Sequence, residues 1–101
     1  MQTFNIRDLQ QRTTELVRDA EAGSLSLVTE HGRPVLIALP VTQRLLEAGV
    51  FEALAVKLYQ DEVLSMSKAA QLAGIPMERF VEALAAAGVE AVSYSAEELY
   101  D

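Results

Sequence analysis

The sequence predicts an α+β fold in which an N-terminal strand–helix–hairpin unit is followed by a helical region with a helix-turn-helix-like pair. Apolar residues recur at helical spacing over residues 9–20 and alternate with polar residues over residues 24–29. A second helical pattern, bounded by glycine and proline, spans residues 66–88. The composition changes over residues 40–49. Two domains are therefore expected, residues 1–49 and residues 50–101.

The first expected helix follows a short strand at residues 3–4 and ends at Gly23. Asn5 is a suitable N-cap because its side-chain oxygen can accept a hydrogen bond from a backbone N–H of the first turn. Glycine favours the backbone conformation that ends many helices. On such a helix Arg12 has Glu15 at pairing distance, which favours a surface ion pair. The side of the helix opposite its apolar residues carries a polar stripe, formed by Arg7, Gln11, Thr14 and Arg18.

A β-hairpin is expected next. Residues 24–29 alternate in polarity, and the segment PVLIAL at residues 34–39 is apolar on both faces. Between them Gly32 can supply the positive φ of a tight turn, and His31 is an exposed corner. One helix covers only one face of a three-stranded sheet, so a second copy of the chain is the simplest cover for the other face. The predicted dimer interface comprises Leu25, Leu27, Leu36 and Ala38.

The remaining elements are expected to be helical. Thr42 can begin a helix that reaches Gly49, and the sequence leaves open whether this glycine breaks or bends the chain before a longer helix. Ser67 is the expected cap of the next helix, Gly74 its end, and Pro76 the first residue of the following helix. The last two helices fit either a DNA-reading helix-turn-helix unit or a helical pair that holds a protein partner. After Gly88, a strand and a capped last turn are expected.

Charge limits the partners. The chain has a net charge of −7, and residues 41–101 carry ten acidic and four basic residues. An acidic chain repels the phosphate backbone, so contact with nucleic acid would have to come from the first forty residues. The acidic second half suits a basic protein partner, although such a surface can also serve only for solubility.

The composition argues against catalysis, and the chain is expected not to be an enzyme. It has no cysteine and one histidine, which excludes thiolate zinc sites, Cys-His catalysis and His-rich metal sites. No phosphate-binding glycine loop is present. We therefore predict no catalytic residue, cofactor or metal. No signal peptide or apolar run long enough to span a membrane is visible, so a cytoplasmic protein without membrane contact is expected.

Residues 1–40 resemble the Phd/YefM antitoxins of bacterial toxin–antitoxin systems, through NIRDLQQRTTELVRDAEAG (residues 5–23) and SLVTEHGRPVLIALP (residues 26–40). The resemblance implies a homodimer with an operator-binding platform and a toxin-binding region beyond it. Gln10 and Glu30 stand where family members commonly carry basic residues that face DNA. The DNA-binding residues that the resemblance implies are Arg7, Gln10, Gln11, Arg12 and Arg33.

Residues 55–101 resemble a second group of short, antitoxin-like prokaryotic proteins with cores of the type SKAAQLAGIPMERFVEAL (residues 67–84). This resemblance implies partnership with a PIN-domain ribonuclease toxin, with other toxin families open. The tail, with aromatic side chains among carboxylates, suits docking onto a basic, partly apolar groove, or else it closes the chain's own core. The expected toxin-binding residues are Leu58, Tyr59, Phe80, Tyr94, Leu99 and Tyr100.

The sequence thus predicts an antitoxin that binds a cognate toxin and represses its own operon as a dimer. The alternative is a stand-alone transcriptional regulator that reads DNA with the helix-turn-helix. In that case Arg79, between Glu78 and Glu82 on the outward side of the second helix, would make the decisive DNA contact.

Overall fold

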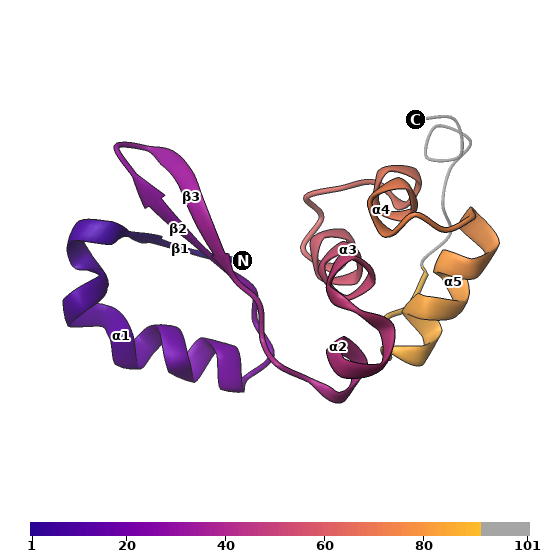
Figure 1. Ribbon diagram of the computed structural model, residues 1–101, viewed down its shortest axis with the longest axis horizontal. Coiled ribbons are helices and arrows are strands. Elements are labelled where there is room, and N and C mark those ends of the chain that lie inside the picture. The colour runs from indigo at the N-terminus through magenta and orange to yellow at the C-terminus, as the bar shows by residue number, and fades with distance from the viewer. Residues whose placement is uncertain (92–101) are drawn as a thin grey trace. The chain divides into compact units, whose positions relative to one another are not determined.

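A computed structural model describes residues 1–91 of the chain (Figure 1). It is an α+β protein, and the described residues form one three-stranded sheet and five helices. The elements in chain order are β1 (Gln2–Asn5), α1 (Ile6–Glu21), β2 (Ser26–Glu30), β3 (Arg33–Ala38), α2 (Gln43–Ala48), α3 (Val50–Gln60), α4 (Met66–Ala73) and α5 (Met77–Ala86). The strand expected over residues 89–94 and the cap at Ser95 lie largely outside the described residues.

The chain divides into two compact units, Met1–Thr42 and Gln43–Asp101. The boundary between these units falls before α2, whereas the change in composition predicts a boundary after Gly49. The reason is that α2 packs against α3, so the short helix belongs with the helical unit. The functions expected for the two domains stay predictions.

Helix α1 begins as the sequence predicts but is not continuous. The Asn5 side chain caps it by accepting a hydrogen bond from the Arg7 N–H at 2.9 Å. Arg12 interrupts the helix with φ −113° and ψ 15°. Next to this point the Thr13 hydroxyl donates to the carbonyl of Leu9 at 2.8 Å, a bond that commonly bends helices. The polar stripe expected of a regular helix is therefore divided at Arg12.

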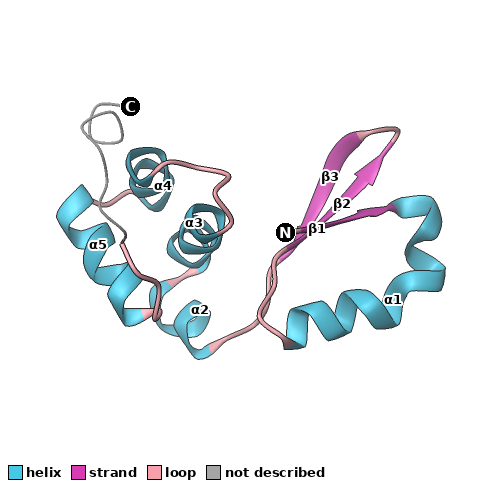
Figure 2. Cartoon of the chain, turned by 180° about the vertical axis from the view of Figure 1, so that it is seen from behind, coloured by secondary structure: helices cyan, strands magenta, loops and turns pink. Residues whose placement is uncertain are grey.

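The sheet has the order β1-β2-β3, with β1 parallel and β3 antiparallel to β2. Helix α1 is the crossover between the two parallel strands (Figure 2). The pairing of β2 and β3 shifts between Val28 and Thr29, because Thr29 is opposite Pro34 while Val28 is opposite Leu36. Proline has no N–H for the ladder, and such positions are typical of β-bulges. The bulge decides which side of the sheet each later residue of β3 occupies.

The hairpin turn is the two-residue loop that the glycine predicted. His31 and Gly32 have φ of 52° and 76°, the pair of positive values that a type I′ turn needs. This conformation suits glycine, and histidine is among the residue types that tolerate it. His31 is exposed and serves as a corner of the hairpin.

The first unit has a small core. Its buried hydrophobic side chains are Phe4, Leu25 and Val28, and no residue of α1 is fully buried. A unit of this size rarely buries enough surface to be stable without a partner.

In the second unit, Gly49 breaks the helix. With φ 90° it separates α2 from α3, and an ion pair between Arg44 Nη2 and Glu52 Oε2 at 2.9 Å joins the two helices across the break. The cap of α4 is Ser65, which accepts from the Lys68 N–H at 3.2 Å, and not Ser67, which is buried inside the helix. Ser65 is the cap because its backbone is extended, with φ −66° and ψ 166°, as an N-cap requires.

Gly74 ends α4 in the left-handed conformation, with φ 73°. Pro76 is the N-cap of α5 and not its first residue, so this helix begins one residue later than expected, at Met77. Helices α4 and α5 thus follow each other across a short loop, and the helix-turn-helix interpretation of this pair stays a prediction.

The core of the second unit lies among α3, α4 and α5. The Phe80 ring is fully buried and meets the Tyr59 ring edge to face, with centroids 6.1 Å apart and planes at 89°. The buried members of this cluster are Ala55, Val56, Met66, Ala69, Ala70, Phe80, Ala83 and Leu84. None of the helices in the described part of the chain has the length and apolar character needed to cross a membrane.

Candidate interaction surfaces

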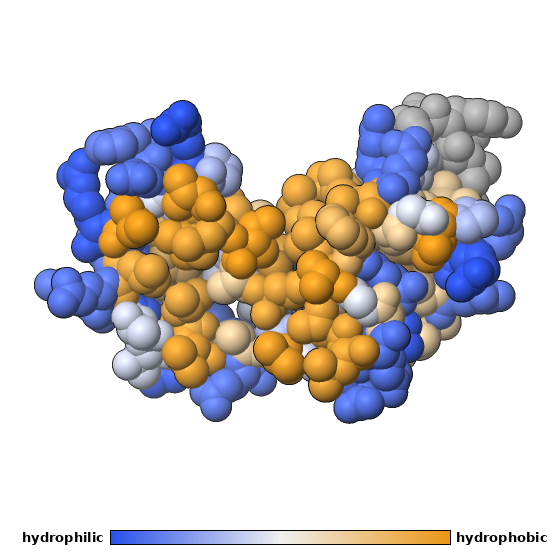
Figure 3. Space-filling model, viewed as in Figure 1, coloured by the Kyte–Doolittle hydropathy of each residue, from blue (hydrophilic) through white to orange (hydrophobic). Residues whose placement is uncertain are grey.

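Strand β3 carries half-exposed apolar side chains on both sides of the sheet. Val35, Leu36 and Ile37 are 45%, 48% and 44% exposed, although all three belong to types that are usually buried. Together with Leu27 and Pro34 they line a shallow hollow of about 360 Å³. We call these five residues the β3 patch. Figure 3 shows apolar side chains gathered on the displayed faces of both units.

Burial and register divide the residues of the predicted dimer interface, which stays a prediction. Leu25 is 1% exposed and belongs to the unit's own core with Phe4, so it is not available to a second chain. Leu36 is opposite Val28, which in turn is opposite Phe4, and these side chains share the side of the sheet that α1 covers.

The uncovered side is occupied by Leu27 and its partner Ile37, a residue that the predicted interface left out. Ala38, paired with Ser26, lies on the same side of the sheet as Leu36. Alternation alone could not place these residues, because every position from Val35 to Leu39 is apolar.

The residues expected to bind DNA fall into two groups. Arg7, Gln10 and Gln11 are exposed on the first part of α1, and Arg33 is exposed at the start of β3. Arg33 is also the register partner of Glu30 at the end of the hairpin, so a carboxylate stands directly opposite this cation. Their role in DNA binding stays a prediction.

Arg12 is occupied within the first unit. Its guanidinium donates two hydrogen bonds to the Glu15 carboxylate, from Nε at 3.0 Å and from Nη2 at 2.8 Å, and lies 4.3 Å from the centre of the Phe4 ring. This hydrogen-bonded pair raises the pKa of Arg12 and lowers the pKa of Glu15. The expected surface ion pair is present, and it ties α1 to the sheet instead of directing Arg12 outward.

The residues expected to bind a toxin are also divided. Phe80 is fully buried in the core of the second unit, so it cannot contact a partner while the unit is folded. Its burial argues against this part of the prediction, because apolar spacing on a helix marks its buried face as readily as a binding face. Leu58 and Tyr59 are half-buried. Tyr94, Leu99 and Tyr100 lie outside the described residues, and their role stays a prediction.

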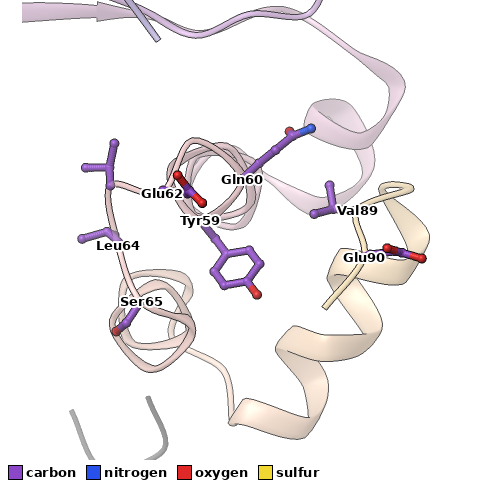
Figure 4. Close-up of a pocket in the computed structure, with 8 residues that line it drawn as sticks. Tyr59, Gln60, Glu62, Leu64, Ser65, Val89 and Glu90 are labelled. Carbon is purple, nitrogen blue, oxygen red and sulfur yellow. The ribbon is translucent and has the colours of Figure 1, made fainter. Parts of the chain in front are cut away.

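Tyr59 borders a hollow of about 400 Å³ (Figure 4). Its ring projects from α3 between the segment of Leu64 and Ser65 and the segment of Val89 and Glu90. Among the residues that the structure describes, no group of three or more histidine, cysteine, aspartate or glutamate residues is arranged to hold a metal ion.

The most exposed apolar side chains of the second unit are not among the predicted site residues. Leu46, Val50 and Phe51, in α2 and the first turn of α3, are 71%, 57% and 64% exposed. The available signal was that residues 50–60 carry apolar side chains around most of the helix, which one buried face does not explain.

Comparison with known proteins identifies the family. The model of the family described as "Uncharacterised protein family (UPF0175)" matches residues 32–101, from the hairpin turn onward. The chain belongs to this family. This member of UPF0175 is also similar to two proteins named Antitoxin VapB46, from Mycobacterium tuberculosis strains CDC 1551 / Oshkosh and ATCC 25618 / H37Rv. Each is 31% identical over 88 residues, which cover 81% of this chain and 86% of the relative.

Proposed function

We propose that this UPF0175 protein is an antitoxin of a toxin–antitoxin system, which binds a cognate protein toxin and neutralises it. The observation that carries the proposal is the similarity to Antitoxin VapB46, which extends over both units. The exposed apolar side chains of each unit agree with a protein that works by association. In this proposal the chain acts in the cytoplasm by binding and performs no catalysis.

The toxin proposed is a PIN-domain ribonuclease, bound by the second unit. Support comes from the resemblance of residues 55–101 to antitoxin-like proteins and from the charge of this part of the chain. Residues 43–91 carry seven acidic and four basic side chains, which favours a partner with a basic surface.

The first unit is proposed to form a homodimer through the β3 patch. Its core of three hydrophobic side chains is small for an independent unit, and the patch adds a contiguous apolar surface on the edge strand. Joining two such surfaces would remove both the exposed apolar area and the unpaired edge.

The dimer is further proposed to bind operator DNA and repress its own operon. Arg7, Gln10 and Gln11 are exposed on α1, and two copies would double this modest set of contacts. Arg12 is left out of the proposed contacts because Glu15 and Phe4 hold it.

Co-expression tests the central proposal. The chain is produced together with the product of the adjacent gene, and growth and complex formation are measured. We expect that the adjacent product alone arrests growth, and that the chain restores growth and copurifies with it. A matched control variant with a disrupted core, Leu84→Asp, should fail to rescue. If the wild-type chain neither binds the product nor restores growth, the proposal is wrong.

A further inference from the structure

Helix α3 has two apolar faces, and only one belongs to the core. Ala55, Val56 and Tyr59 face the cluster formed with α4 and α5. A second apolar stripe is formed by Val50, Leu54 and Leu58, which are four residues apart, together with Phe51 beside Val50. None of these four residues belongs to the core cluster or to the side chains packed against it. We call them the outer face of α3.

The outer face is exposed most strongly where the helix begins. Val50 and Phe51 are 57% and 64% exposed, while Leu54 and Leu58 are half-buried. The Arg44–Glu52 ion pair at 2.9 Å fixes α2 against this first turn, so the helix start is held in place although Gly49 interrupts the chain. A preordered apolar helix face with anchors one turn apart is the form in which helices dock into grooves.

Charge around the outer face indicates the partner. The last turn of α3 carries one cation, Lys57, and the carboxylates of Asp61 at the helix end and of the exposed Glu62 outnumber it. At the other end the cation Arg44 is already paired with Glu52 and lies 3.7 Å from Glu47. A second copy would bring these carboxylates together, which is unfavourable. A partner with an apolar groove and basic side chains at its rim is complementary.

We infer that the outer face of α3, Val50, Phe51, Leu54 and Leu58, is the surface that enters an apolar, basic-rimmed groove of the toxin. This inference rests on the proposed function and identifies the part of the chain that carries it. Phe51 is the central anchor, because aromatic side chains dominate the binding free energy of protein interfaces. The carboxylate of Glu62 meets the basic rim and accelerates association.

The test uses the full chain and the purified product of the adjacent gene, with affinity measured by calorimetry. We expect Phe51→Glu to weaken binding by about thirtyfold or more, as for an anchor residue. The matched control is Val17→Glu, which places the same charge at a site in α1 that is 51% exposed. It should change affinity by less than about threefold. Glu62→Lys should slow association, and the effect should shrink at high salt.

The possible results distinguish the antitoxin role of the chain from the role of the outer face of α3. Equal affinity of Phe51→Glu and the wild-type chain overturns this inference and leaves the antitoxin role intact. Failure of the wild-type chain to bind the product overturns the antitoxin role and, with it, this inference. The free variants are also examined by thermal unfolding and sedimentation. A lower melting temperature or a changed oligomeric state of free Phe51→Glu would show that the chain itself covers the outer face, which also overturns the inference.

Discussion

The contrast between two phenylalanines of the second unit gives the sharpest test of the structure. Phe80 is 0% exposed and stacks edge to face on Tyr59, whereas Phe51 is 64% exposed at the start of α3. The same substitution, to alanine, removes the same atoms at both sites. The difference in the free energy of unfolding between the variants therefore reports the different surroundings of the two rings.

The expected magnitude follows from the environment of each ring. Replacing a buried phenylalanine with alanine costs about 3–5 kcal/mol, through lost burial and the cavity that remains. A unit of this size, Gln43–Asp101, has a total stability of about 3–9 kcal/mol. Phe80→Ala should thus remove most of the stability of the second unit. Phe51→Ala should change it by about 0.5 kcal/mol or less, as for an exposed site.

Urea unfolding followed by circular dichroism measures both variants in the full chain. Phe80→Ala should unfold at a much lower urea concentration than the wild-type chain, and Phe51→Ala at nearly the same concentration. If Phe80→Ala is as stable as the wild-type chain, the ring is not in the core and the packing described here is refuted. In that case the original expectation, that Phe80 contacts a toxin, would stand again.

Four further predictions concern the first unit, one helix end and DNA. Ile37→Glu should weaken the homodimer at least about tenfold, measured by sedimentation equilibrium, because it charges the β3 patch. Glu15→Gln should lower stability near neutral pH, measured by urea unfolding over pH. The pKa of Glu15 is lowered in the folded chain, so its stabilisation is present above the ordinary value of 4.5 and is lost as pH falls through the lower folded value. Gly74→Ala should destabilise by about 1–2 kcal/mol in thermal unfolding, since open space surrounds the site and only its φ of 73° opposes a side chain. Arg7→Ala should weaken operator binding in a gel-shift titration, whereas Arg79→Ala should not.

Each of these has a clear contrary result. Val63→Glu, at a site 49% exposed in the other unit, should leave the dimer unchanged, and equal dissociation of both variants would argue against the β3 patch. A stability difference for Glu15→Gln that persists at acid pH would mean that packing, not charge, is responsible. A Gly74→Ala variant as stable as the wild-type chain would contradict the left-handed backbone at that site. Loss of operator binding in Arg79→Ala alone would favour the stand-alone regulator.

Local chemistry explains which parts of the fold the sequence predicts well. The Asn5 cap, the turn at Gly32 and the helix end at Gly74 each depend on one residue and its immediate backbone, and all three are present in the structure. The predicted cap at Ser67 was wrong because Ser65 is also a serine, and either side chain can cap a helix. Only the backbone at the start of α4, which depends on how α3 and α4 pack, distinguishes them.

The candidate surfaces were harder to predict for a different reason. An apolar residue at helical spacing is consistent with a core or with an interface, since both remove it from water. Phe80 and Phe51 have the same side chain, and of the two only Phe80 was among the predicted toxin-binding residues. The structure buries Phe80 and exposes Phe51. Likewise, Leu25 and Leu27 alternate with serines, yet only Leu25 is fully buried.

By itself the sequence determined the α+β class, the order of the elements in the described residues and the absence of the residue types needed for thiol or His-rich metal chemistry. These follow from short-range periodicity and from composition. The tertiary structure alone decided that Arg12 is held by Glu15 and Phe4, that the bulge at β3 leaves Ile37 on the uncovered side of the sheet, and that the outer face of α3 lies outside the core. Burial and register depend on contacts between segments far apart in the chain, and local spacing does not encode which apolar residues those contacts cover.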